Sequence, residues 1–229
     1  MKSKVLLSLS GGVDSTALYS RFHTGGFEVH PYFFKYPSKH NDMEHQAASR
    51  VAAHYEMLGQ FPLAIIDTTA IFQGVKSHLL IDGGDIPSSE YTKESLSLTV
   101  VPGRNLIFAS ILASQAQSLW TSEDKEIYIA LGMHAGDHEI YADCRPEFVK
   151  ALRETVSQSS EDKVTVFAPL IELEKYQVVL LGADSGAPFE LTRSCYNGGD
   201  RPCRVCSTCL EREKAFAKAG MEDPILKEI

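Results

Sequence analysis

Short apolar runs alternate with stretches of helical periodicity along most of this 229-residue chain. Five of the runs are short and rich in β-branched or aromatic residues, which predicts strands. They are Lys4 to Leu9, Glu28 to Phe34, Leu63 to Asp67, Ile127 to Gly132 and Val164 to Phe167. Strands with so few polar positions are typical of a parallel sheet that is covered on both faces.

The segments between and after these runs carry apolar residues three and four positions apart, the spacing of a helix with one buried face. They cover Asp14 to Phe22, Asn41 to Met57, Arg104 to Leu119, Pro146 to Gln158, Glu172 to Asp184 and Thr208 to Lys218. This alternation predicts an α/β fold, a Rossmann-like parallel sheet flanked by helices. Residues 74–98, with a Gly83-Gly84 pair, Pro87 and several serines, predict a long loop with room for one helical turn.

The composition is that of an ordinary soluble domain. Hydrophobic residues make up 44% of the chain, which is enough for a substantial core. The length suits one domain with a small appendage, so we expect an α/β domain over residues 1–190 and a C-terminal element over residues 191–229. No apolar run approaches the ~20 residues of a membrane span, and Val5 to Leu9 is too short for a signal sequence. We therefore expect a cytoplasmic protein without membrane contact.

The formal net charge of the chain is −8. A protein that grips nucleic acid through its phosphates needs a basic face, so we expect no stable nucleic-acid binding. A small anionic ligand in a local pocket is compatible with this charge.

The segment Ser10-Gly-Gly-Val-Asp-Ser15 lies where the first predicted strand ends and the first helix begins. Its glycines permit positive φ and leave no Cβ between the backbone N–H groups and an anion. The start of the helix adds unpaired N–H donors and the positive end of its dipole. Ser10 and Ser15 can add hydroxyl hydrogen bonds, and Asp14 can cap the helix or help to hold Mg²⁺. The pattern predicts a phosphate site, and we call residues 10–15 the phosphate loop.

This loop is not a Walker sequence, because no Gly-Lys-Ser/Thr follows, and it is not a dinucleotide fingerprint. The plain alternative is a strand-to-helix turn in which Gly, Asp and Ser have only turn and cap roles. The loop resembles that of the PP-loop ATP pyrophosphatases, in which it holds the diphosphate of ATP. The resemblance implies ATP contacts from Leu9, Ser10, Gly11, Gly12, Val13, Asp14, Ser15, Thr16, Ala17 and Leu18.

Four of the five cysteines, Cys195, Cys203, Cys206 and Cys209, lie close together near the C-terminus. Four thiolates are the number that a tetrahedral structural zinc site takes, and they leave no open position for catalysis. Free buried cysteines would not cluster in this way, and a redox Cys-x2-Cys pair would leave two of them unexplained. An iron–sulfur cluster uses the same ligands, but we favour structural Zn²⁺. Cys144 is interpreted as a packing residue rather than a nucleophile.

Six motifs occur in one order over nearly the whole chain. They are Ser10-Gly-Gly-Val-Asp-Ser-Thr16, His40-Asn-Asp-Met-Glu44, Val101-Pro-Gly-Arg-Asn105, Asp137-His-Glu-Ile-Tyr-Ala-Asp-Cys-Arg-Pro-Glu-Phe148, Pro169-Leu170 followed by Lys175, and Thr192-Arg-Ser-Cys-Tyr-Asn197 with the cysteine tail. Together they resemble the 7-cyano-7-deazaguanine synthases of the queuosine pathway. Ala142 departs from the proline that is usual in that family, and Arg193 departs from an aromatic residue. The first affects a turn, and the second can alter the substrate pocket.

The resemblance implies an ATP-dependent C–N ligase that converts 7-carboxy-7-deazaguanine and ammonia into 7-cyano-7-deazaguanine. The substrate carboxylate attacks ATP to give an acyl adenylate, and ammonia displaces AMP to give the amide. A second adenylation, now of the amide oxygen, leads to the nitrile. Adenylation is needed because neither oxygen can leave unaided. ATP, Mg²⁺ and Zn²⁺ are the implied cofactors, and a homodimer is the implied assembly.

The same resemblance implies roles for individual residues. The implied catalytic set is Asp14, Ser15, His40, Glu44, Arg104 and Lys175, and the implied substrate contacts are Arg104, Asp143 and Arg145. Arg104 and Lys175 would neutralise charge on the α-phosphate or the diphosphate. His40 and Glu44, four apart on one helical face, would orient the substrate or take a proton from ammonium. Without the motifs, Arg104 and Glu44 would be interpreted as plain surface charges.

Three other functions stay open. A relative that stops at 7-amido-7-deazaguanine, or that uses another acceptor, is kept open by Arg193. A tRNA-modifying PP-loop enzyme is disfavoured by the acidic charge and by the lack of a basic appended domain. A non-catalytic binding module with a zinc ribbon is disfavoured by the intact phosphate loop.

A second metal at His134, Asp137 and His138 is disfavoured, because their spacing is no zinc signature and Mg²⁺ seldom takes histidine.

Overall fold

A five-stranded parallel sheet lies at the centre of the computed structural model, which describes residues 3–86, 97–138, 141–197, 199 and 201–226. The strands are β1 (Lys4–Ser8), β2 (Glu28–Lys35), β3 (Ala64–Asp67), β4 (Ile127–Ala130) and β5 (Val164–Phe167). Their order across the sheet is β3-β2-β1-β4-β5, and each neighbouring pair is parallel. Lys4 of β1 is in register with Glu28 on one side and Ile127 on the other. This topology confirms the predicted α/β fold.

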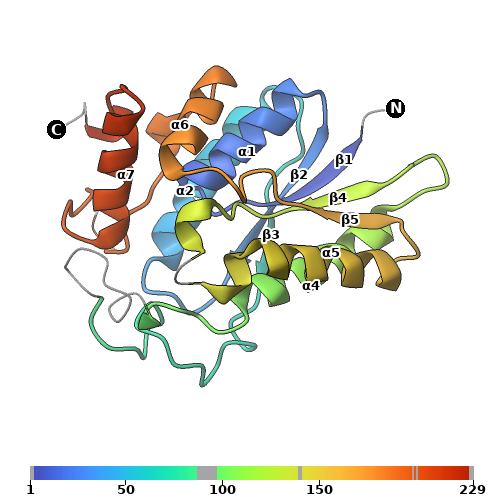
Figure 1. Ribbon diagram of the computed structural model, residues 1–229, viewed down its shortest axis with the longest axis horizontal. Coiled ribbons are helices and arrows are strands. Elements are labelled where there is room, and N and C mark those ends of the chain that lie inside the picture. The colour runs from blue at the N-terminus through green and yellow to red at the C-terminus, as the bar shows by residue number, and fades with distance from the viewer. Residues whose placement is uncertain (1–2, 87–96, 139–140, 198, 200, 227–229) are drawn as a thin grey trace.

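Helices cover both faces of the sheet (Figure 1). They are α1 (Val13–Thr24), α2 (Asn41–Glu56), α4 (Arg104–Leu119), α5 (Pro146–Ser159), α6 (Lys175–Asp184) and α7 (Ser207–Lys218). Leu6 of β1 belongs to the core beneath α4 and α5, whereas Val5 and Leu7 belong to the core beneath α1, α2 and α6. Successive side chains of a strand point to opposite faces, so a strand between two cores is apolar throughout. Among the described helices, none combines the length and apolarity needed to span a bilayer.

The predicted strands and helices are all present, with ends that differ by at most a few residues. The largest difference is at α6, which begins at Lys175 rather than at Glu172. The side chain of Gln177 accepts a hydrogen bond from the backbone N–H of Glu174 at 2.8 Å, which is one half of a capping box. This cap fixes the start of α6 and so places Lys175 at the beginning of the helix.

The long predicted loop lies only partly within the described residues. Residues 74–86 form turns, with an antiparallel bridge between Leu80 and Ser38, and residues 87–96 are outside the described part. Phe72 and Leu79, just before and within this segment, are buried in the core beside α4. The described part of the segment is therefore packed onto the domain.

The turn between β1 and α1 depends on Gly11. Its φ is +76°, and a Cβ at this position would lie 2.4 Å from the backbone nitrogen of Ala48 in α2. The Gly11 carbonyl accepts a hydrogen bond from the backbone N–H of Arg193 at 2.9 Å. Helix α2 and the segment before the cysteines thus hold this turn from two sides.

The C-terminal segment joins the domain through α7, which packs against α6 (Figure 1). Arg212 of α7 is buried and forms a two-pronged ion pair with Asp223 at 2.7 and 2.9 Å. It also donates to the carbonyl of Phe189 at 3.2 Å. These bonds fasten α7 to the chain on either side of it. The predicted boundary between residues 190 and 191 stays a prediction.

We expect Gly11→Ala to lower the free energy of unfolding by at least about 3 kcal/mol, because the added Cβ meets the α2 backbone and the residue must keep positive φ. Urea denaturation measures the loss. Gly26→Ala is the matched control, since Gly26 has φ +79° but a Cβ there meets no atom within 4 Å. It should cost roughly 1–2 kcal/mol. Equal losses in the two variants would contradict the role assigned to the contact with α2.

Candidate active site

A cavity of about 600 Å³ opens at the carboxyl ends of β1 and β4. In open parallel sheets ligands bind at this crevice, where the order of the strands reverses. The polar and aromatic side chains that line it include Ser10, Asp14, Ser15, Tyr36, His40, Glu44, Arg104, His134, Asp137, Lys175, Arg193, Tyr196 and Glu211. The phosphate loop, Arg104 and Lys175 therefore face one shared space.

The phosphate loop is ordered by hydrogen bonds among its own residues. The backbone N–H of Gly12 donates to Ser10 Oγ at 3.3 Å, and Ser15 Oγ donates to the Gly12 carbonyl at 3.3 Å. The two serine hydroxyls lie 3.2 Å apart. Gly12 is the N-cap of α1 and has no side chain to satisfy the amides of the first turn. The positive end of α1 therefore stays uncapped beside the cavity, as an anion site requires.

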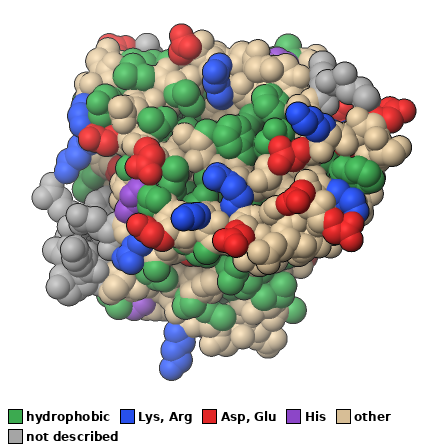
Figure 2. Space-filling model, turned by 45° about the vertical axis from the view of Figure 1, so that its right-hand side comes forward, with side chains coloured by type: hydrophobic (Ala, Val, Ile, Leu, Met, Phe, Trp, Pro, Cys, Tyr) green, Lys and Arg blue, Asp and Glu red, His purple; other side chains and the backbone are tan. Residues whose placement is uncertain are grey.

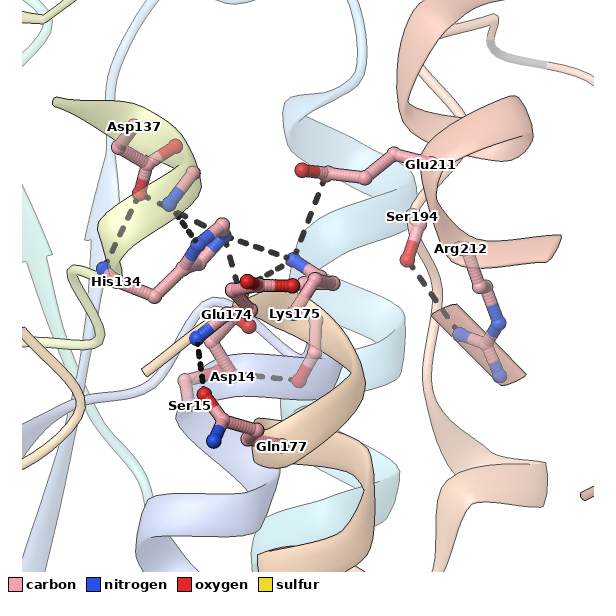
Figure 3. Close-up of polar contacts among 12 residues, drawn as sticks. Asp14, Ser15, His134, Asp137, Glu174, Lys175, Gln177, Ser194, Glu211 and Arg212 are labelled. Carbon is pink, nitrogen blue, oxygen red and sulfur yellow. Dashed lines mark hydrogen bonds and ion pairs between the residues drawn. The ribbon is translucent and has the colours of Figure 1, made fainter. Parts of the chain in front are cut away.

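Lys175 reaches the phosphate loop and is surrounded by carboxylates (Figure 3). Its Nζ lies 2.6 Å from Asp14 Oδ2 and 3.6 Å from Glu211 Oε2 of α7. Burial opposes the ammonium charge, but the neighbouring carboxylates outweigh it and raise the pKa of Lys175. Burial likewise opposes the charge of Asp14, yet the Lys175 ammonium outweighs it through its charge and its hydrogen bond, and it lowers the pKa of that carboxyl. Both members of the ion pair are therefore charged at neutral pH.

His134 and Asp137 lie beside Lys175, in the turn that follows β4 (Figure 3). The Nδ1 atom of His134 accepts a hydrogen bond from the Gly136 N–H at 3.1 Å, and Asp137 Oδ2 accepts from the His134 N–H at 3.3 Å. These reciprocal bonds cap the short 3-10 helix Ala135–Asp137. The Nε2 atom of His134 lies 3.3 Å from Lys175 Nζ. Burial raises the pKa of the Asp137 carboxyl.

Arg104, His40 and Glu44 form a second polar group in the cavity. Arg104 is the first residue of α4, and its Nη1 donates to the Tyr36 hydroxyl at 3.3 Å. His40 precedes α2 and Glu44 lies in its first turn, with 3.6 Å between His40 Nε2 and Glu44 Oε1. The His40 ring is 4.9 Å from the ring of Tyr196, measured between centroids.

Burial controls the protonation of this second group. Burial, together with the positive charges of Arg104 and Arg193, lowers the pKa of His40 to about 3. Burial raises the pKa of Glu44 to about 7, although the same two guanidinium groups oppose the shift. At neutral pH His40 is neutral, while Glu44 is divided between its two protonation states. A carboxyl that titrates near neutrality is suited to proton transfer.

An aromatic wall lies next to Arg104. The rings of Phe34 and Phe108 are stacked with 4.0 Å between centroids, and the Tyr36 ring meets Phe108 edge-on at 5.9 Å. All three residues line the cavity. The cavity thus combines an apolar wall with a cluster of charged groups, a common composition for a small-molecule site.

Asp143 and Arg145 do not line this cavity. Asp143 Oδ2 accepts a hydrogen bond from the backbone N–H of Asn105 at 3.2 Å, in the first turn of α4. Arg145 is exposed, and its Nε donates to the carbonyl of His138 at 2.9 Å. The start of α4 and the turn after β4 need these partners for their free backbone groups. The two side chains thus support the cavity wall. The substrate contacts expected of them stay a prediction.

The sulfur atoms of the four cysteines form one cluster, in which each lies within 4.8 Å of the others. The backbone N–H of Cys203 donates to Cys195 Sγ at 3.4 Å, and that of Cys206 donates to Cys203 Sγ at 3.3 Å. Four sulfurs at such spacing fit around one tetrahedral ion, and the N–H donors offset part of the charge of the thiolates. The cluster is a candidate metal site.

Glu211 is a site residue that sequence reasoning missed. It lies two positions after Cys209 on α7, and no pattern in the sequence relates it to Lys175 of α6. His134 and Asp137 were weighed only as metal ligands, and the cysteine cluster is the one potential metal-binding group found among the described residues. Tertiary packing alone brings these side chains to the phosphate loop.

The sequence model of queuosine biosynthesis protein QueC matches residues 4–220 of the chain. The chain belongs to this family. It is 39% identical over 226 residues to a 7-cyano-7-deazaguanine synthase of Archaeoglobus fulgidus, with 98% of this chain and 90% of the relative covered. A protein of the same name from Caldicellulosiruptor saccharolyticus is 38% identical, with 99% and 96% covered. The resemblance inferred from the six motifs is confirmed.

Comparison of structures supports the fold. The structure of NMN synthetase from Francisella tularensis matches with a TM-score of 0.53 and 15% sequence identity, covering 99% of this chain and 81% of that one. At this identity the likeness is one of fold only. The QueC family member described here therefore has an α/β architecture shared with a more distant protein.

We expect the free energy of unfolding to depend on pH through Glu44. The pKa of Glu44 is about 7 in the folded chain against an ordinary value of 4.5, so between these values the folded state binds more protons than the unfolded state. Stability contributed by Glu44 is therefore lost as pH rises from about 4.5 to 7. Glu44→Gln should become progressively more stable than the wild type as pH rises from about 5 to 8, as measured by thermal unfolding. The exposed residue Glu172, changed to Gln, is the control, and a parallel trend there would contradict the assignment.

Proposed function

We propose that this QueC family member is an ATP-dependent ligase that converts 7-carboxy-7-deazaguanine and ammonia into 7-cyano-7-deazaguanine. The observation that carries the proposal is the placement of the phosphate loop, Arg104 and Lys175 around one cavity. The name shared by its relatives supports the choice of substrate and product. Adenylation is supported by the chemistry, since a carboxylate must acquire a leaving group before ammonia can displace its oxygen.

The phosphate loop and Lys175 are the proposed binding site for ATP. The uncapped start of α1 and the hydroxyls of Ser10 and Ser15 offer donors to the phosphates, and Lys175 offers a positive charge. Asp14 Oδ1 is buried and has no hydrogen-bond partner among the described residues. A free carboxylate oxygen suits Mg²⁺, so Asp14 is the proposed protein ligand for the ion that accompanies ATP. Bound there, Mg²⁺ would offset charge on the phosphates.

The group around Arg104 is the proposed binding site for the deazaguanine substrate. Phe34 and Phe108 give a planar heterocycle an apolar wall, and Arg104 can pair with its carboxylate. Glu44 is the proposed base that takes a proton from ammonium, because its pKa lies near neutrality. His40, which stays neutral, is the proposed residue that orients it.

The reaction then has two parallel halves. In the first, a carboxylate oxygen attacks the α-phosphorus and diphosphate leaves, after which ammonia adds to the acyl carbon and AMP leaves. In the second, the amide oxygen attacks the α-phosphorus of another ATP, and loss of AMP with one more proton gives the nitrile. A single cavity serves both halves, because carboxylate and amide have nearly the same shape.

Surface charge supports a small-molecule substrate over nucleic acid. Acidic and basic side chains are interspersed over the face in Figure 2, whereas phosphate backbones favour a continuous basic surface. We expect no stable nucleic-acid complex. The homodimer and the cytoplasmic location implied by the sequence stay predictions.

The expected product is the nitrile, detected by mass spectrometry after incubation with ATP, ammonia and 7-carboxy-7-deazaguanine. The double variant Ser10→Ala, Asp14→Ala should remain folded and release no pyrophosphate, because it lacks a hydroxyl donor and the carboxylate beside Lys175. Full activity in this variant would rule out the loop assignment. Accumulation of the amide in the wild type would favour the enzyme that stops at 7-amido-7-deazaguanine. Arg193 lines the cavity in place of the aromatic residue usual in the family, so it can influence which product forms.

We propose Zn²⁺ as the ion of the four-cysteine site. Elemental analysis of the purified chain should find about one zinc per molecule. Cys206→Ser should lower the zinc content and the melting temperature together, because a structural ion contributes directly to folding. Cys144→Ser is the matched control, as Cys144 is buried but lies outside the cluster. Detection of iron with acid-labile sulfide in the wild type would contradict this assignment and identify the site as an iron–sulfur cluster.

A further inference from the structure

We propose that the buried imidazole of His134 is a further anion-binding group, which donates its Nε2–H to the diphosphate part of ATP. The inference rests on the proposed function, because the ligand it names is the nucleotide of that reaction. His134 lines the cavity, and only 2% of the residue is exposed. Figure 3 shows its ring directed toward Lys175 and the first turn of α1.

The position of the proton on His134 follows from its neighbour. Nδ1 lies 3.1 Å from the backbone nitrogen of Gly136, which carries a hydrogen and can only donate. Nδ1 is therefore the acceptor, and the neutral ring carries its proton on Nε2. Gly136 makes this approach possible, because a Cβ there would lie 2.8 Å from Cε1 and 3.0 Å from Nδ1 of the ring.

The Nε2–H group has no acceptor at hydrogen-bond distance among the described residues. Asp137 Oδ2 lies 3.7 Å away and Asp14 Oδ1 lies 4.0 Å away, both beyond a normal hydrogen bond. Lys175 Nζ is closer, at 3.3 Å, but an ammonium has no lone pair, so this contact brings two donors together. A buried donor without an acceptor costs stability and calls for an explanation.

An anion is the ligand that would give the Nε2–H group its missing hydrogen-bond acceptor. His134 Nε2–H and the Lys175 ammonium are 3.3 Å apart, close enough to donate to oxygens of one phosphate group. The uncapped start of α1 lies beside them and adds backbone donors. A metal ion does not fit His134, because coordination needs a lone pair on Nε2, and that atom holds the proton while Nδ1 accepts from Gly136.

Two substitutions of His134 separate the hydrogen-bond donor at Nε2 from the acceptor at Nδ1 that caps the short 3-10 helix. His134→Asn puts an amide oxygen near the position of Nδ1, so it keeps the acceptor for Gly136 and loses the donor at Nε2. His134→Gln puts an amide nitrogen near the position of Nε2, so it keeps the donor and loses the acceptor. Calorimetric titration of the full chain with inorganic pyrophosphate is the measurement. We expect His134→Asn to bind about tenfold more weakly with little change in melting temperature, and His134→Gln to bind within about twofold with a lower melting temperature.

Nitrogen NMR of the unmodified chain tests the same point without a variant. Long-range proton–nitrogen correlation should show His134 with a bare Nδ1 and a protonated Nε2. Addition of pyrophosphate should shift the Nε2 resonance and leave Nδ1 nearly unchanged. A purely structural His134 would show no such selective shift. This measurement decides the question even if both variants fail to fold.

Unchanged pyrophosphate affinity in His134→Asn, or a wild type that does not bind pyrophosphate, would overturn the inference. The product assay separates this failure from failure of the proposed function. Nitrile formation by the wild type with equal affinities in all three proteins keeps the function and removes the role of His134. Loss of affinity in His134→Asn, in a chain that forms no nitrile, keeps the anion site and removes the assigned substrate.

Discussion

The turn after β1 is the constraint on which the site depends. Gly11 lies against the backbone of α2 with no room for a Cβ, and its carbonyl is bonded to the backbone of Arg193. Because the turn is held on both sides, the first residues of α1 have a fixed position relative to α2, β4 and the C-terminal segment. Asp14 then has a fixed position too, and it determines where the ammonium of Lys175 rests.

Two groups of ionisable residues line the cavity, one around Lys175 and the other around Arg104. Around Lys175, the carboxylates of Asp14 and Glu211 hold the ammonium group beside the start of α1. Around Arg104, burial keeps His40 neutral and brings Glu44 close to its titration point. Perturbed pKa values of this kind cluster at functional sites.

The sequence was sufficient to predict the order of strands and helices, because the central strands are largely buried on both sides and each helix has its own apolar periodicity. The phosphate loop and the cysteine cluster could also be located, since both are local patterns with a chemical meaning. Glu211 and His134 could not be placed, because their contacts with Lys175 join α7, the turn after β4 and α6. Asp143 and Arg145 illustrate the opposite problem. They belong to a recognisable motif, but the motif did not indicate that their side chains bond to the backbone of Asn105 and His138 instead of lining the cavity.

The cysteine segment contributes side chains to the wall of the cavity. Arg193, Tyr196 and Glu211 all line the cavity, and they lie before, within and after the run of cysteines. During synthesis on the ribosome, the β1–α1 turn emerges first and the residues that close the cavity emerge last. A growing chain therefore has no complete cavity until its cysteine segment has left the exit tunnel and folded.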